Sequence, residues 1–180
     1  EIALDKGFEK DLNIGVIGTG NMGGAIIRGL TRSGRISPEH LLAYDVDAKK
    51  LEDIAKDVVG FRAAPGNREL AEFADVVIIA VKPDAVGSVL NDIYPAVDGN
   101  TLVVSIAAGI PISYIESRLR AGVRVVRVMP NTPAIVGAGS CVACAGSKAS
   151  EGDLRIVREL FSSVGVVHIL KEEHMDAVTG

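Results

Sequence analysis

The fold of this chain is decided by residues 13–30, which read NIGVIGTGNMGGAIIRGL. An apolar run typical of a strand leads into the pattern Gly18-x-Gly20-x-x-Gly23, and apolar residues at helical spacing follow it. A glycine pattern between a strand and a helix is typical of a dinucleotide-binding turn. Gly18 would allow the tight turn, Gly20 the approach of a pyrophosphate, and Gly23 close packing of the helix. The pyrophosphate would lie on the free amides at the helix N-terminus.

An acidic residue, Asp45, ends the next predicted strand, 22 residues beyond Gly23. A carboxylate there accepts hydrogen bonds from an adenosine ribose and repels a 2′-phosphate, which favours NADH. Lys49 and Lys50 lie close enough in the sequence to reduce that repulsion, so NADPH is not excluded as a cofactor. The alternative interpretation of Asp45 is a turn residue without a ligand.

The bulk properties indicate a folded protein of one domain or slightly more, with 180 residues and 48% hydrophobic content. The net charge of −4 is spread along the chain, and no basic run has aromatic neighbours, which argues against a nucleic-acid partner. The longest apolar run, residues 76–81, is too short to cross a membrane, and no signal-peptide pattern is present. We therefore expect a cytoplasmic protein without a membrane partner.

The two cysteines, Cys141 and Cys144, form a lone CxxC in a stretch that is typical of a strand. Residues three apart on a strand point to opposite faces, so the two sulfurs do not converge. No further cysteine exists to complete a zinc site. We expect two small buried side chains and no metal.

Strand and helix patterns alternate along the chain, which predicts an α/β fold, a Rossmann-type doubly wound and mostly parallel sheet with helices on both faces. Asn67 is expected to cap a helix that reaches Phe73, and Ser150-x-x-Asp153 is a capping pattern that opens another helix. After the first unit we expect strands at residues 40–44, 60–63, 76–81, 101–106, 123–128, 139–145 and 164–170, and helices at residues 47–56, 67–73, 84–90 and 112–120.

The chain divides into three predicted parts. Residues 1–11 are expected to be an N-terminal extension and residues 12–170 the dinucleotide-binding domain. Residues 171–180 would begin a helix whose apolar residues Met175, Ala177 and Val178 have no partner within the sequence. We therefore expect a second, C-terminal domain that is missing from this chain.

Five segments are expected to meet beyond the carboxyl ends of the parallel strands, where such sheets bind ligands. Asn67 is a further candidate, either as a contact to ribose or phosphate or as a helix cap only. The five segments are the Gly18 loop, Asp45, Lys82-Pro83, Ala107-Ala108-Gly109 and residues 129–133.

Candidates for proton transfer are scarce in the sequence. No tyrosine has a lysine four residues later, because Ala48, Asp98 and Arg118 stand at those positions. His168 falls inside a predicted strand and His174 outside the predicted site. A protonated substrate such as an iminium accepts hydride with little help from a general acid.

Five motifs in this order, VIGTGNMGGAI, AVKP, SIAAGI, MPNTPA and DAVTG, resemble the N-terminal domain of the pyrroline-5-carboxylate reductase family. The resemblance implies reduction of the cyclic imine 1-pyrroline-5-carboxylate to L-proline by NADPH or NADH, the last step of proline biosynthesis. Asp45 departs from the residues that many relatives use for a 2′-phosphate. The resemblance implies a pyrophosphate loop of Gly18, Thr19, Gly20, Asn21 and Met22, an adenosine contact at Asn67, a middle section at Lys82 and Pro83, and a nicotinamide border of Ala107, Gly109, Met129, Asn131 and Pro133.

The same resemblance implies an all-helical C-terminal domain after DAVTG that builds a homo-oligomer and holds the substrate carboxylate. Catalytic residues are then expected mainly beyond Gly180, and this chain alone is expected to bind cofactor while reducing substrate poorly. Two alternatives remain open. One is another Rossmann-domain reductase, acting on a β-hydroxyacid or a deazaflavin, and the other is a non-catalytic module that senses NAD(P)H.

Overall fold

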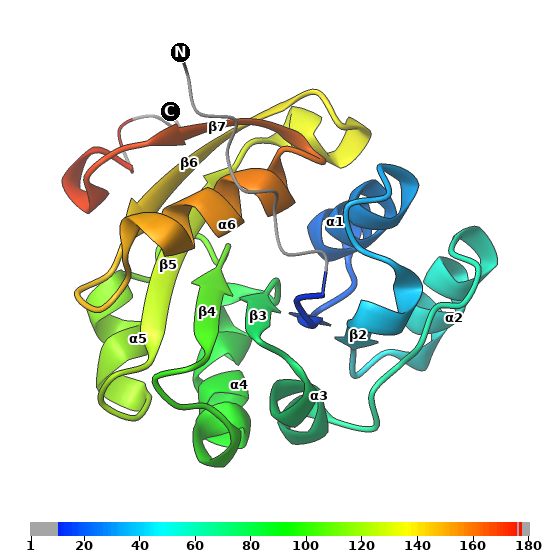
Figure 1. Ribbon diagram of the computed structural model, residues 1–180, viewed down its shortest axis with the longest axis horizontal. Helices are drawn as coiled ribbons and strands as arrows, with labels where there is room; N and C mark the ends of the chain where they lie inside the picture. Colours follow the sequence, from blue (N-terminus) through cyan, green and yellow to red (C-terminus); the bar gives the residue numbers. More distant parts are fainter. Residues whose placement is uncertain (1–10, 176, 178–180) are drawn as a thin grey trace.

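The computed structural model describes residues 11–175 and 177, and these residues form one seven-stranded sheet (Figure 1). The predicted extension at residues 1–10 and most of the end of the chain lie outside the described residues. The strand order is β2-β1-β3-β4-β5-β6-β7. The strands are β1 (Ile14–Ile17), β2 (Leu41–Tyr44), β3 (Val76–Ile79), β4 (Leu102–Ser105), β5 (Arg124–Pro130), β6 (Gly139–Ala145) and β7 (Gly165–Ile169).

The first five strands all pair in parallel, whereas β6 pairs antiparallel with β5 and β7 pairs in parallel with β6, so β6 and β7 both run opposite to the other five strands. Only a short segment containing η4 (Thr132–Val136) joins β5 to β6, whereas a parallel pair needs a long crossover. The predicted doubly wound, mostly parallel sheet is confirmed.

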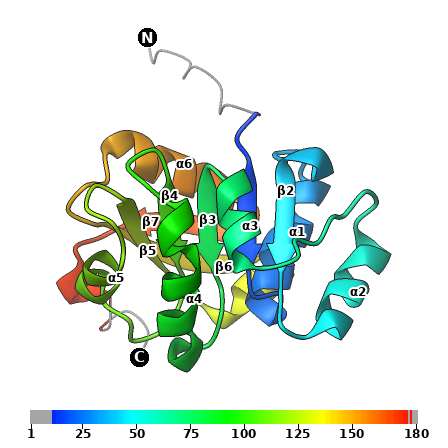
Figure 2. The same ribbon diagram turned by 90° about the horizontal axis from the view of Figure 1, so that it is seen from below.

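Helices cover both faces of the sheet (Figures 1 and 2). On one face, apolar residues of α1 (Asn21–Arg32), α2 (Ala48–Asp57) and α6 (Glu151–Phe161) pack in one core. On the other face, α3 (Asn67–Phe73), α4 (Val86–Ile93) and α5 (Ile112–Arg118) enclose a second core. Strand β3 is buried along its whole length, because it lies between the two layers.

Short 3-10 helices complete the connections: η1 (Pro38–His40), η2 (Pro83–Ala85), η3 (Tyr94–Ala96), η4 and η5 (Glu172–His174). The capping prediction for α6 is confirmed, because the side chains of Ser150 and Asp153 each bond to the other's backbone amide. No helix among the described residues has the length and apolar character needed to cross a membrane.

Two sequence-based expectations about local structure are wrong. Residues 60–63 form no strand, and a single bridge joins Ala63 to Ala43, because the left-handed turn at Gly60 and Pro65 leave too few extended residues between them. The N-cap of α3 is Gly66, and Asn67 is already the first helical residue. The predicted start of a helix at residues 171–180 lies partly outside the described residues, and the described part contains η5.

The two cysteines are confirmed as small buried side chains on β6. Cys141 packs in the core on the α1 face and Cys144 in the core on the α4 face, so their sulfurs are separated by the sheet. Burial raises the pKa of Cys141 to about 11, which keeps the thiol protonated and unreactive at neutral pH.

Candidate functional site

The loop between β1 and α1 depends on three glycines, each for a different reason. Gly18 has a φ of +93°, and a Cβ there would lie 2.6 Å from the carbonyl oxygen of Ala80. A Cβ on Gly23 would lie 1.9 Å from the carbonyl oxygen of Gly18, so the first turn of α1 packs directly on the loop. A Cβ on Gly20 would meet no heavy atom within 4 Å. The protein itself therefore requires Gly18 and Gly23, while Gly20 borders open space.

The N-terminus of α1 has no capping side chain. Gly20 is the N-cap, and the first turn carries no acidic residue. The first free amides of a helix attract anions, both through hydrogen bonds and through the helix dipole. In this chain they lie where Gly20, Asn21 and Met22 border a cavity, so a phosphate group fits there.

Asp45 follows β2 and holds the glycine loop from the side. One carboxylate oxygen accepts hydrogen bonds from the amide of Thr19 at 2.7 Å and from its hydroxyl at 3.1 Å, and the other accepts from the amide of Asp47 at 2.9 Å. Burial raises the pKa of Asp45, but these bonds and the ammonium of Lys50 outweigh burial and hold the pKa below its ordinary value. A negative charge therefore stands at this end of the site.

A cavity of about 1000 Å³ runs along the carboxyl ends of β1 to β5. This size suits a small organic cofactor, and its walls are mainly apolar. Each of the five predicted segments contributes to the cavity, which brings together residues from Gly18 to Pro130. Of the predicted site residues, the cavity is lined by Gly18, Gly20, Asn21, Met22, Asp45, Asn67, Lys82, Ala107 and Met129.

The other predicted site residues are not among those that line the cavity. Thr19 is buried under Asp45, and Pro83 opens η2. Gly109 occupies a left-handed turn with a φ of +72°. The side chain of Asn131 accepts a hydrogen bond from the amide of Ser140 at 2.9 Å, which ties it to β6, and Pro133 lies on the exposed surface of η4.

Asn67 is held by a residue that the sequence did not connect with it. Its amide nitrogen donates to the carboxylate of Asp92 on α4 at 3.0 Å, while its side-chain oxygen is buried and has no hydrogen-bond partner among the described residues. A buried acceptor without a partner is costly, so a donor from a bound molecule would stabilise it. Asn67 thus offers a ligand an acceptor rather than a cap to its helix.

Sequence reasoning missed the contribution of α4 to the cavity wall. Ser88 and Asp92 are four residues apart, so they share one face of the helix, and both line the cavity. That spacing was visible in the sequence, but nothing local indicated that this face turns to the site. Tyr44, Val46, Arg68, Glu69, Ala85, Val89 and Pro95 also line the cavity and were not predicted.

Among the described residues, the ionisable groups of the cavity wall do not include a histidine or a cysteine. Its carboxylates are Asp45, Glu69, Asp84 and Asp92, its bases are Lys50, Arg68 and Lys82, and Tyr44 adds a phenol. The two histidines considered from the sequence, His168 and His174, are exposed on β7 and η5. The site therefore offers binding groups and charge, with little capacity for acid catalysis near neutral pH.

Comparison with known proteins shows the family to which this chain belongs. A family model described as "NADP oxidoreductase coenzyme F420-dependent" matches residues 13–109, more than half of the chain. A pyrroline-5-carboxylate reductase from Methanosarcina acetivorans is 40% identical over 167 residues, which are 93% of this chain and 62% of that protein. The chain thus spans about three-fifths of the length of this relative.

Solved structures give the same picture. The pyrroline carboxylate reductase of Plasmodium falciparum with NADP bound has 34% sequence identity and a TM-score of 0.81, with 93% of this chain and 60% of that chain covered. A pyrroline-5-carboxylate reductase from Coxiella burnetii has 31% identity and a TM-score of 0.85, over 93% of this chain and 62% of that one. The fold is therefore shared with enzymes that carry this name.

Proposed function

Because the chain belongs to the family described as F420-dependent NADP oxidoreductases, we propose that it is the cofactor-binding part of a pyrroline-5-carboxylate reductase. The observation that carries the proposal is the cavity that starts at the uncapped N-terminus of α1 and extends to Met129. The similarity to reductases of this name extends over 93% of the chain, beyond the glycine loop alone. Since the chain covers only part of those proteins, the activity of the whole protein is part of the proposal.

The cofactor is NADPH or NADH, and its extended shape fits the order of groups along the cavity. The adenosine ribose would lie between Asp45 and Asn67, whose buried oxygen lacks a donor. The pyrophosphate would bind the amides at the start of α1, on the loop of Gly18, Thr19, Gly20, Asn21 and Met22. Lys82 and Pro83 would flank the middle, and Ala107, Gly109, Met129, Asn131 and Pro133 would border the nicotinamide.

The chemistry that fits this site is hydride transfer to a carbon–nitrogen double bond. When bound, reduced nicotinamide supplies the hydride. The residues of this chain orient it, exclude water with apolar walls, and leave the substrate to bring its own proton as an iminium. The product of such a step from 1-pyrroline-5-carboxylate is L-proline, so we assign the chain to proline biosynthesis.

The remaining parts of the whole protein are inferred from the same family. We propose that residues 12–170 are the dinucleotide-binding domain and that a further helical domain supplies the catalytic groups, the substrate carboxylate site and the contacts of a homo-oligomer. A cytoplasmic location and a small-molecule substrate, without nucleic acid or membrane as partner, agree with this assignment.

The experiment uses the complete protein and follows nicotinamide absorbance with 1-pyrroline-5-carboxylate as substrate. Turnover with this imine supports the proposal. Calorimetry with NADH and NADPH then tests binding directly, and the absence of heat with both nucleotides would refute it. The 180-residue chain alone is expected to bind cofactor and to show little turnover.

A second candidate follows from the description of the matching family, which mentions coenzyme F420. A reductase of this kind would transfer hydride between NADP and a deazaflavin. Offering the complete protein reduced deazaflavin, a β-hydroxyacid and pyrroline-5-carboxylate in parallel separates the candidates by their turnover. Cofactor binding without turnover of any of them would favour a nucleotide-sensing module.

A further inference from the structure

The sheet contains a buried arginine that is not among the binding groups described above. Arg127 lies on β5, and only 3% of its side chain is exposed. In the sheet register it lies between Ser105 on β4 and Cys144 on β6. A buried guanidinium is costly unless a carboxylate and hydrogen bonds compensate its charge. Its carboxylate therefore has to come from elsewhere in the chain.

A carboxylate that pairs with Arg127 belongs to Glu172, in the segment that follows β7. One oxygen of Glu172 accepts from Nη1 of Arg127 at 3.2 Å and from the backbone amide of Ile112 at 2.8 Å. Ile112 is the first residue of α5, and its N-cap Pro111 provides no side-chain hydrogen bond. Glu172 therefore satisfies an amide that the helix itself leaves free. Three residues after Glu172 this segment is held a second time, because the side chain of Met175 is completely buried.

Residues 106–111 connect this ion pair to the cavity. They join β4 to α5, and Ile106, Ala107 and Ala108 line the cavity at its far end. The loop is held at its start, where the amide of Ala107 donates to the hydroxyl of Ser105 at 3.3 Å. It is held at its end by the bond from Ile112 to Glu172. The position of this wall therefore depends on a carboxylate 60 residues away in the sequence.

We propose that Glu172 and Arg127 are positioning residues for the nicotinamide half of the cofactor. Arg127 fixes the carboxylate of Glu172, and Glu172 fixes the end of the 106–111 loop. This inference rests on the proposed function, because the loop matters to a dinucleotide only if one occupies the cavity. The adenosine half of the site lies at β1 and β2, on strands that contact neither residue, so it does not depend on them.

The test compares two ligands in the complete protein. ADP probes the glycine loop and the adenosine end, whereas NADH and NADPH also reach the 106–111 loop. Glu172→Ala is expected to weaken binding of the nicotinamide nucleotides about tenfold and to change ADP binding less than twofold. Glu172→Gln keeps an oxygen for the amide of Ile112 and is expected to restore most of the affinity. The matched control is Glu173→Ala, since Glu173 is the exposed neighbour.

Amide hydrogen exchange gives a readout that does not depend on the cofactor. Exchange at residues 106–112 is expected to accelerate in Glu172→Ala and to stay unchanged in Glu173→Ala. If Glu172→Ala does not fold, the double variant Arg127→Met with Glu172→Ala removes both charges and still lacks an acceptor for Ile112. The double variant then replaces it in each measurement.

Two results would overturn the inference. One is an equal loss of affinity for ADP and for the nicotinamide nucleotides, which indicates general destabilisation. The other is unchanged affinity together with unchanged exchange at residues 106–112. If the wild-type protein binds neither nicotinamide nucleotide, the proposed function fails, and the exchange experiment still decides whether Glu172 positions the loop.

Discussion

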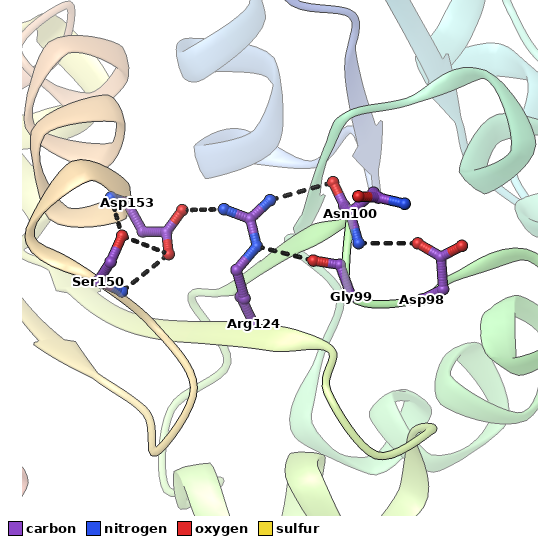
Figure 3. Close-up of polar contacts among 6 residues, drawn as sticks. All are labelled: Asp98, Gly99, Asn100, Arg124, Ser150 and Asp153. Atoms are coloured by element: carbon purple, nitrogen blue, oxygen red, sulfur yellow. Dashed lines mark hydrogen bonds and ion pairs between the residues drawn. The ribbon is translucent and has the colours of Figure 1, made fainter.

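The polar groups at the amino ends of the parallel strands and those at the carboxyl ends, here called the amino-end edge and the carboxyl-end edge, are arranged in opposite ways. At the amino-end edge, Arg124 at the start of β5 pairs with Asp153 of α6, and its remaining donors reach the carbonyls of Gly99 at 3.2 Å and Asn100 at 3.0 Å (Figure 3). Asp153 is only 1% exposed, and its other oxygen accepts from Ser150. The two charged groups of this cluster, Arg124 and Asp153, are therefore paired within the protein itself.

At the carboxyl-end edge, polar groups are left for something else to bind. Within the described residues, the first turn of α1 has no side-chain cap, Gly20 borders open space, and the buried oxygen of Asn67 has no partner. The uncapped amides and the unpartnered oxygen cost stability in the protein alone. The difference teaches that one edge maintains the fold and the other is prepared for a ligand. Four predictions test this division, from the largest expected effect to the smallest.

The largest effect is expected at the amino-end edge. Asp153→Ala leaves the guanidinium of Arg124 without its carboxylate and removes the capping box of α6, so the free energy of unfolding should fall by about 3 kcal/mol. Denaturant unfolding measures this loss. Cofactor affinity, measured under conditions where the variant is folded, should stay within twofold. Glu151→Ala is the control, because this exposed residue in the same turn has no ion pair among the described contacts.

The second prediction adds a methyl group to the glycine loop at the carboxyl-end edge. Gly20→Ala should weaken binding of NADH and NADPH about 100-fold, since its Cβ would occupy the space of the pyrophosphate, and should lower stability by less than about 1 kcal/mol. Calorimetry and denaturant unfolding measure the two quantities. Gly23→Ala is the contrasting variant, because its Cβ collides with the carbonyl of Gly18 and should destabilise the protein. Tight binding by Gly20→Ala would remove the pyrophosphate from this loop.

The third prediction concerns the choice between the two cofactors. Asp45→Asn removes the negative charge while keeping the shape of the side chain, so the ratio of affinities should move about tenfold toward NADPH. Calorimetry with both nucleotides measures the ratio. Asp47→Asn, a change in the N-cap residue of α2 two positions later, should leave the ratio unchanged. An unchanged ratio in Asp45→Asn would mean that the carboxylate only holds Thr19.

Much of the carboxyl-end edge was predictable because the sequence patterns that mark it are local. Gly18, Gly20, Gly23 and Asp45 are marked by their spacing from strands and helices, and parallel strands bring their carboxyl ends together by geometry. The capping box of α6 lies within four residues and was found for the same reason. Short-range patterns therefore predicted the fold and the place of the cavity.

The details that failed or were missed depend on partners far away in the sequence. Asn67 looked like a helix cap, but its partner is Asp92, 25 residues later. Residues 60–63 had a strand composition but found only one bridge with Ala43. The pairing of Glu172 with Ile112 spans 60 residues. No local pattern encodes such contacts, because they exist only after the layers of the fold have packed.

The smallest effect is expected from pH, and it concerns the bonds that Asp45 makes within the protein. Its pKa is held below the ordinary value by Thr19 and Asp47 despite burial, so ionised Asp45 stabilises the folded state above the unfolded pKa of about 3.9. That contribution is lost as the pH falls through the lower, folded-state value. The difference in unfolding free energy between wild type and Asp45→Asn should therefore be constant from pH 8 to about pH 5 and shrink below about pH 4. Denaturant unfolding across this range measures it. A difference that persists unchanged at the acid end would show that the charge of Asp45 adds nothing to the stability of the glycine loop, and that the side chain acts there through hydrogen bonds that do not depend on its ionisation.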